Sequence, residues 1–281
     1  MAETDVWAEW LRNRRTGGSP EERRKLLELL APVRDKLLDD AEVGPGDTVL
    51  DVGCGDGLVG LGALERGADV IFSDISNACL DDCRAIAGDR ARYRVAPATD
   101  LGAVEADVVT MRSVLIYVDD KQRAFDEFFR VLRPGGRLSI FEPINRFGME
   151  ERCQTFGFAD VDGIEELLGR IWRDEEEAGV NEAMVNFGAR DLFDHAERAG
   201  FGEVRLELHA ETKPEPMWQT RDWDVFVNSS PNPLLPTLAE TMAAKLTRDE
   251  IERVTAKLRP QVEQGLGSTR FAKAYLLARK C

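Results

Sequence analysis

Residues 48–60 read Thr-Val-Leu-Asp-Val-Gly-Cys-Gly-Asp-Gly-Leu-Val-Gly, and this stretch decides the fold. Its first five residues, 48–52, are rich in β-branched and apolar side chains, which is typical of a buried strand. Glycines follow at 53, 55 and 57, and apolar residues at helical spacing come next. Glycine permits left-handed backbone and close approach of a ligand. Strand, glycine turn and helix together therefore predict a nucleoside site at the N-terminus of the helix.

The same alternation of short apolar strands and helices continues through the first half of the chain. It predicts parallel strands joined by helices that cover both faces of a sheet, an α/β fold. The expected strands are 48–52, 70–72, 93–95, 107–111, 137–141, 204–209 and 271–278. The main expected helices are 21–38, 77–87, 120–131, 191–199, 235–245 and 248–264.

The spacing of these elements predicts four regions. Residues 1–45 are expected to form an N-terminal helical flap, and residues 46–145 a Rossmann-like cofactor-binding core. Residues 146–190 are longer than a simple connection requires, which favours a lid or substrate-binding insertion. Residues 191–281 are expected to complete the core sheet, with a helical insertion at about 214–266.

Composition excludes several classes of protein. The 281 residues carry 37 Lys and Arg against 52 Asp and Glu, a net charge of −15. This acidic balance argues against binding to nucleic acid or to an anionic membrane, since both need a basic surface. No apolar run approaches the ~20 residues that span a bilayer. The sequence start shows no secretory signal, and the five scattered cysteines form no CxxC pair, so we expect a cytoplasmic protein without a metal site.

Two acidic residues flank the glycine turn. Asp51 lies at the end of the first strand, two residues before the first glycine, where it could receive a cationic amine. Asp74 ends the next strand, where a carboxylate can accept hydrogen bonds from ribose hydroxyls. The spacing Gly55-x-Gly57-x-x-Gly60 also matches the dinucleotide fingerprint, so an NAD(P)-dependent oxidoreductase is a second interpretation.

Two motifs resemble class I S-adenosylmethionine-dependent methyltransferases of the small-molecule or natural-product type. Residues 49–57 (Val-Leu-Asp-Val-Gly-Cys-Gly-Asp-Gly) resemble the first motif of that family. Residues 131–138 (Val-Leu-Arg-Pro-Gly-Gly-Arg-Leu) resemble its fifth strand and the turn before it. The resemblance implies a doubly wound, seven-stranded, mostly parallel sheet whose last strand is antiparallel. It also implies S-adenosylmethionine as cofactor and S-adenosylhomocysteine as product.

The family's cofactor roles can be carried over residue by residue. Asp51 and the backbone of Gly53 and Gly55 would face the methionine amine and carboxylate, and Asp74 the ribose. The remaining positions that match the family's cofactor segments are Cys54, Gly57, Ile75, Ala98, Thr99, Asp100, Met111, Arg112 and Ser113. Ile75 would pack on adenine, residues 98–100 would line its edge, and residues 111–113 would receive the ligand's amine.

The sequence departs from the family pattern at two places. Residues 96–98 read Ala-Pro-Ala where the family often has Gly-Asp-Ala, so Asp100 either accepts from the adenine amino group or caps a turn. Tyr117 stands where related enzymes often carry histidine.

Catalytic residues are harder to assign, because methyl transfer needs alignment of the nucleophile and at most a base. Tyr117 and Glu142 are the candidates; Glu142 could hold a substrate amine or hydroxyl, or cap the chain reversal at Pro143. The predicted substrate-binding residues are Trp10, Tyr117, Glu142, Asn145, Arg146 and Trp172.

The expected reaction is methyl transfer to a small molecule or a short peptide. Oxygen is the first acceptor to consider and nitrogen the next, with carbon also open. A homodimer is one expected assembly. Besides the oxidoreductase, a non-catalytic ligand-binding member of the fold and an aminopropyl-transfer enzyme remain as alternatives.

Overall fold

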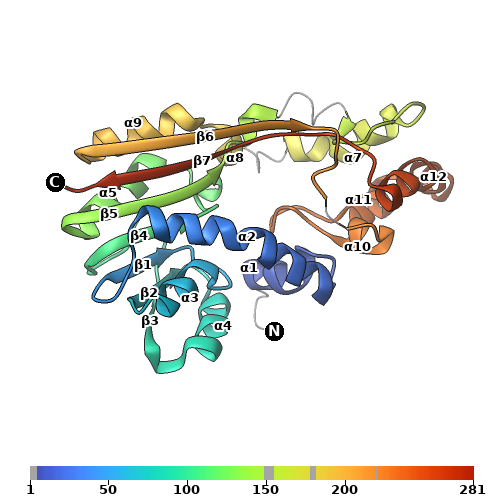
Figure 1. The fold of residues 1–281 in the computed structure, drawn as a ribbon. Coiled ribbons are helices and arrows are strands. Elements are labelled where there is room, and N and C mark those ends of the chain that lie inside the picture. Colours follow the sequence, from blue (N-terminus) through green and yellow to red (C-terminus); the bar gives the residue numbers. More distant parts are fainter. Residues whose placement is uncertain (1–4, 149–154, 178–181, 219) are drawn as a thin grey trace. The chain divides into compact units, whose positions relative to one another are not determined.

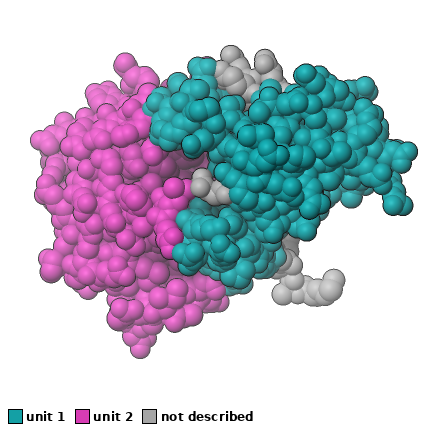
Figure 2. Space-filling model, turned by 45° about the vertical axis from the view of Figure 1, so that its right-hand side comes forward, with its two compact units in different colours: residues 1–26, 147–182, 210–271 teal, residues 27–146, 183–209, 272–281 magenta. Residues whose placement is uncertain are grey.

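The computed structural model describes residues 5–148, 155–177, 182–218 and 220–281. The chain divides into two compact units, coloured separately in Figure 2. Unit 1 comprises residues 1–26, 147–182 and 210–271. Unit 2 comprises residues 27–146, 183–209 and 272–281, and it contains most of the sheet.

Seven strands form one sheet in the order β3-β2-β1-β4-β5-β7-β6 (Figure 1). Strands β1 to β5 are parallel to one another, and β7 pairs antiparallel with β5. The predicted seven-stranded α/β sheet with an antiparallel last strand is therefore confirmed. The strands are β1 Thr48–Val52, β2 Asp69–Asp74, β3 Ala91–Val95, β4 Ala106–Arg112, β5 Leu132–Pro143, β6 Glu203–Lys213 and β7 Thr269–Arg279.

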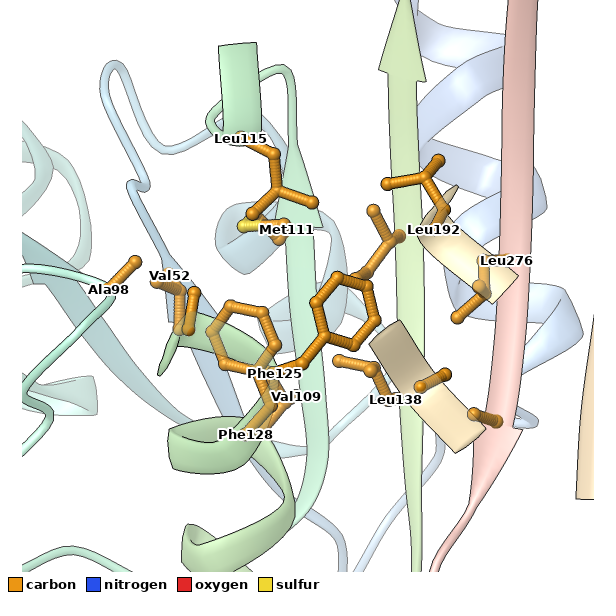
Figure 3. Close-up of a cluster of buried hydrophobic side chains, with 14 of the residues drawn as sticks. Val52, Ala98, Val109, Met111, Leu115, Phe125, Phe128, Leu138, Leu192 and Leu276 are labelled. Atoms are coloured by element: carbon orange, nitrogen blue, oxygen red, sulfur yellow. The ribbon is translucent and has the colours of Figure 1, made fainter. Parts of the chain in front are cut away.

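Helices cover both faces of the sheet in unit 2. On one face, Phe125, Phe128 and Leu192 from α5 and α9 pack against apolar side chains of β1, β4, β5 and β7 (Figure 3). On the other face, α2, α3 and α4 pack on the opposite side chains of β1 and β2. These helices are α2 Pro20–Asp40, α3 Leu58–Glu65, α4 Asn77–Ala87, α5 Lys121–Val131 and α9 Ala189–Ala199. Short 3₁₀ turns lie at η2 Gly88–Arg90 and η3 Leu115–Tyr117.

The helix boundaries follow from local capping. The Ser76 and Asp120 side chains accept backbone N–H groups at the starts of α4 and α5. Helix α9 ends at Gly200, whose φ of 103° lies in the left-handed region that favours glycine. The connection between β3 and β4, residues 96–105, contains no helix.

Unit 1 is helical and has its own core. Phe158, Leu168, Trp223 and Leu258 are among the buried side chains of this core. None of the helices among the described residues has both the length and the apolar character needed to cross a membrane. The elements of the unit are α1 Val6–Glu9, the π-helix η1 Trp10–Arg14, α7 Glu165–Glu177, α10 Trp223–Asn228, α11 Leu238–Lys245 and α12 Arg248–Gln264. The links η4 Asn145–Gly148 and α8 Glu182–Val185 join the two units along the chain.

The unit boundaries differ from the four regions expected from sequence. The second half of α2 belongs to unit 2, because Val33, Leu37 and Leu38 are buried in the core on one face of the sheet. Residues 183–190 also belong to unit 2. There, the buried Lys121 ammonium donates to the carbonyl of Ala183 and to the Asn186 side chain, at 3.0 and 2.7 Å.

Gly60 on α3 tests the packing of that helix on the sheet. A Cβ at Gly60 would lie 2.3 Å from Cε1 of the buried Phe72 ring. Gly60→Ala should therefore lower the free energy of unfolding by about 1–3 kcal/mol, although alanine favours helix. Urea denaturation would measure the change, with Gly44→Ala as control, because a Cβ at Gly44 meets nothing within 4 Å. Equal stability of the two variants would contradict this packing.

Candidate functional site

The predicted cofactor residues converge at the carboxyl edge of the sheet in unit 2. Strands β1, β2, β4 and β5 run parallel, so the segments after them meet at one edge. This brings together the glycine turn 53–57, Asp74 with Ile75, residues 111–113, and Glu142.

Asp51 is buried and both of its carboxylate oxygens have protein donors. Oδ1 accepts from the Thr110 hydroxyl at 3.0 Å, and Oδ2 accepts from the Gly60 N–H at 2.9 Å. One side chain thereby joins β1, β4 and α3. Burial raises the pKa of Asp51 to about 7 against these hydrogen bonds. Its contact with a ligand amine stays a prediction.

The turn after β1 has the expected left-handed glycines. The φ values of Gly53, Gly55 and Gly57 are 64°, 53° and 82°. A Cβ at Gly53 would lie 2.4 Å from Cγ2 of Val114. Glycine at position 53 is therefore also needed because Val114, from the segment after β4, packs directly over it.

Cys54 lies behind this turn. It is buried, and its Sγ is 4.0 Å from Sγ of Cys83 on α4. The hydrogen-bonding contact with the Cys83 thiol, together with burial, raises the pKa of Cys54 well above its usual value. The thiol is therefore packed in the core, and only the backbone of Cys54 remains a candidate for cofactor contact.

Asp74 and Ile75 place a carboxylate next to an exposed apolar side chain. The Asp74 carboxylate accepts from the N–H groups of Gly55 and Ser76, both at 2.9 Å. The next side chain, Ile75, is 51% exposed although it is large and apolar. A fixed carboxylate beside an exposed apolar side chain and a left-handed glycine turn suits the ribose and base of a nucleoside.

Residues 98–100 follow β3 at the same edge. Ala98 is buried in the sheet core, and Thr99 is half-buried. Asp100 is exposed, and its Oδ1 accepts from the Gly102 N–H at 3.2 Å. This bond is the one expected of a turn cap, so the contact of Asp100 with an adenine amino group stays a prediction.

The segment after β4 bends sharply at Ser113. Ser113 has a φ of 57°, a conformation that costs free energy in a non-glycine residue, and its N–H donates to the Phe141 carbonyl at 2.9 Å. Met111 is fully buried, and Arg112 is half-buried. The charge of Arg112 acts on both Asp51 and Glu142, opposing the rise that burial causes in their pKa values.

Glu142 holds this segment in place. Its Oε1 accepts from the N–H groups of Val114 and Leu115 at 2.8 and 2.9 Å. Its Oε2 is buried and has no hydrogen-bond partner among the described residues. Burial raises the pKa of Glu142 to about 7. The observed role differs from the predicted cap at Pro143, because the carboxyl group holds the backbone of the segment after β4. The contact of Glu142 with substrate stays a prediction.

The other predicted substrate residues are divided between the units. Tyr117 is half-buried in unit 2. Asn145 donates to the Met184 carbonyl at 3.3 Å, and Arg146 is exposed. In unit 1, Trp10 is buried and donates its indole N–H to the Ser230 carbonyl at 2.7 Å. Trp172 lies in α7, and its side chain is outside the part of the chain that the structure describes.

The contacts of three residues escape prediction from sequence: Thr110 and Val114 in this site, and Lys121 at the start of α5. Thr110 lies opposite Asp51 where β4 pairs with β1. The sequence signal for this contact is one polar residue in each of two buried strands, because buried polar groups need hydrogen-bond partners. Val114 and Lys121 give no such signal, because an apolar residue after a strand and a lysine at a helix start are common.

The fold defines a Rossmann-like domain, and the predicted cofactor residues meet at the carboxyl edge of its sheet. Residues 50–140 match the family described as "Methyltransferase domain". The strand order of the sheet and its antiparallel β7 agree with the fold that the resemblance to class I methyltransferases implies, and residues 50–140 are similar to a methyltransferase domain.

Sequence similarity to known proteins covers more of the chain than residues 50–140. A ubiquinone biosynthesis O-methyltransferase of Hahella chejuensis is 35% identical over 159 residues, which cover 54% of this chain and 64% of that protein. The leading curated relatives are matched over 43% to 64% of their own length, so the chain spans about half of them.

Solved structures share the fold. A putative methyltransferase from Bacillus halodurans has a TM-score of 0.55 at 17% identity, over 88% of this chain and 98% of that one. Phosphoethanolamine N-methyltransferase 2 of Haemonchus contortus, in complex with S-adenosyl-L-methionine, has a TM-score of 0.51 at 16% identity, over 98% of this chain and 56% of that one.

Glu142→Gln should change how stability depends on pH. The glutamine keeps an acceptor for the two amides but cannot ionise. The contribution of Glu142 to stability is fully present below its unfolded pKa of 4.5 and is lost as pH rises through about 7. We compare the free energies of unfolding of the parent and the variant. The parent value minus the variant value should fall by roughly 2–3 kcal/mol between about pH 5 and pH 8.

Urea denaturation of both proteins at the two pH values would measure this change. The raised pKa of Asp51 is common to both proteins and cancels in the difference. A difference that stays constant with pH would show that Glu142 is ionised in the folded protein as in the unfolded one.

Proposed function

We propose that this protein transfers a methyl group from S-adenosylmethionine to a small molecule or a short peptide. The observation that carries the proposal is the Asp74 carboxylate, fixed at the carboxyl edge of the sheet by the N–H of Gly55 in a left-handed glycine turn. The turn and the acid belong to a methyltransferase domain, and a structural neighbour binds S-adenosyl-L-methionine.

The chain's own residues would hold the cofactor by simple chemistry. Asp74 accepts hydrogen bonds from the ribose hydroxyls, and the exposed Ile75 packs on the adenine ring. Residues 98–100 line the base, and the backbone of residues 111–113 meets the amino-acid end. The half-buried guanidinium of Arg112 adds a positive charge that suits a carboxylate there.

Bound S-adenosylmethionine supplies an activated methyl group on a sulfonium, so the protein needs no covalent intermediate. The task of the protein is to align the acceptor atom with the methyl carbon and to exclude water. Glu142 serves this task indirectly, by fixing residues 114 and 115. Tyr117 remains the proposed base or substrate contact, because it is half-buried on the turn that follows.

Oxygen is the proposed acceptor atom, and nitrogen the next choice. The support is the 35% identity to a ubiquinone biosynthesis O-methyltransferase, which covers 54% of this chain. The oxidoreductase alternative is disfavoured by topology, since β7 is antiparallel and lies between β5 and β6. The Rossmann dinucleotide fold instead orders its strands 3-2-1-4-5-6.

Asp74→Ala tests the proposed cofactor site. Loss of the carboxylate should weaken the binding of S-adenosylmethionine and S-adenosylhomocysteine by about 1–3 kcal/mol, or roughly 5- to 150-fold. The reason is that the ribose hydroxyls and the Gly55 N–H lose their acceptor. Calorimetric titration with each ligand, and with NADH for comparison, would measure the affinities. Asp69→Ala is the matched control, since Asp69 begins the same strand and is exposed.

Three outcomes of that titration decide the proposal. Binding of both adenosyl ligands to the parent, weakened only in Asp74→Ala, supports the cofactor site. Binding of NADH instead would show that the glycine turn serves a nicotinamide cofactor. Unchanged affinity in Asp74→Ala would remove Asp74 from the ribose site.

A further inference from the structure

A pocket of about 670 Å³ lies in unit 2 at the edge of the sheet opposite the glycine turn. Residues 103–105, which lead into β4, and Arg130 and Arg133, which precede the paired part of β5, contribute to its lining. These segments mark the amino ends of the parallel strands, whereas the glycine turn follows the carboxyl end of β1. The pocket is therefore separate from the proposed cofactor site.

The pocket exists because one face of the outer strand lacks a helix. Strand β3 is at the edge of the sheet, and its connection to β4 is a loop without a helix. Alternation along the strand puts Arg92 and Arg94 on the same face, and both line the pocket together with Ile71 of β2. The Cα atoms of Arg92 and Arg94 are thus about 7 Å apart along one strand.

The four arginines of the pocket differ in their partners. Arg130 is paired with Glu127 at 2.7 Å, and Arg133 with Asp107 at 2.8 Å. Arg92 and Arg94 have no carboxylate within ion-pair distance among the residues that the structure describes. Arg94 donates from Nη1 to the Ala103 carbonyl at 3.4 Å, and its Nε is buried without a hydrogen-bond partner.

Such arginines are unexpected in this chain. Acidic residues outnumber basic ones by 52 to 37, so carboxylates are plentiful. A buried N–H without an acceptor is destabilising, and a ligand oxygen that accepted from it would remove this cost. Guanidinium forks bind phosphate oxygens in pairs, and a tetrahedral phosphate can accept from two arginines that approach from different directions.

We infer that Arg92 and Arg94 form a binding site for the phosphate group of a small molecule, at the sheet edge opposite the proposed cofactor site. The inference does not depend on methyl transfer. The competing explanation is that the arginine stems cover the exposed face of β3 while their charged ends stay in water. That explanation predicts no saturable anion binding.

Calorimetric titration of the full chain with inorganic pyrophosphate, at constant ionic strength, tests the site. We expect one saturable site in the parent protein. Arg92→Gln with Arg94→Gln should weaken binding at least about tenfold, since two charge-assisted contacts are lost. The matched control is Arg190→Gln with Arg248→Gln, which removes the same charge from exposed positions and should change the affinity less than about twofold.

The single variant Arg92→Gln guards against a loss of folding, because Arg92 is exposed. It should weaken pyrophosphate binding while leaving the thermal unfolding midpoint without ligand unchanged. Absence of saturable binding to the parent at about 10 mM pyrophosphate, or equal weakening in the control pair, would overturn the inference. Titration with S-adenosylmethionine in the double variant keeps the two proposals distinct, since that affinity should not change.

Discussion

The site of this protein depends on one buried carboxyl group. Asp51 accepts from Thr110 on β4 and from Gly60 on α3, so one side chain links β1, β4 and α3. A buried carboxyl group is tolerated only when its oxygens find donors, and here both do. Its position fixes where β1 stops, and thereby where the glycine turn begins.

A second layer of contacts places the two loops of the site against each other. Glu142 holds the amides of Val114 and Leu115, and the Val114 side chain lies on Gly53. The loop after β4 and the turn after β1 therefore cannot move independently without opening a packed contact. Arg112 adds a positive charge near both buried acids, which keeps the electrostatics of this edge balanced.

Much of the fold follows from the sequence, because its signals are local. The strand 48–52 and the helix 77–87 agree with the structure residue for residue, since hydrophobic pattern and caps such as Ser76 specify them. The convergence of Asp51, Asp74 and Glu142 follows from parallel topology. What could not be predicted depends on three-dimensional proximity. The Val114–Gly53 contact, the Lys121 bonds and the grouping of three separate stretches into unit 1 have no local signature.

The place of β7 in the sheet has a consequence for how the chain is made. Residues 269–279 are synthesised after every other strand, yet they lie between β5 and β6. While the ribosome is still elongating the chain, β5 has an open edge and β6 has nowhere to pair. The sheet can be completed only after these residues emerge, so β5 keeps an unpaired edge while residues 144–268 are synthesised.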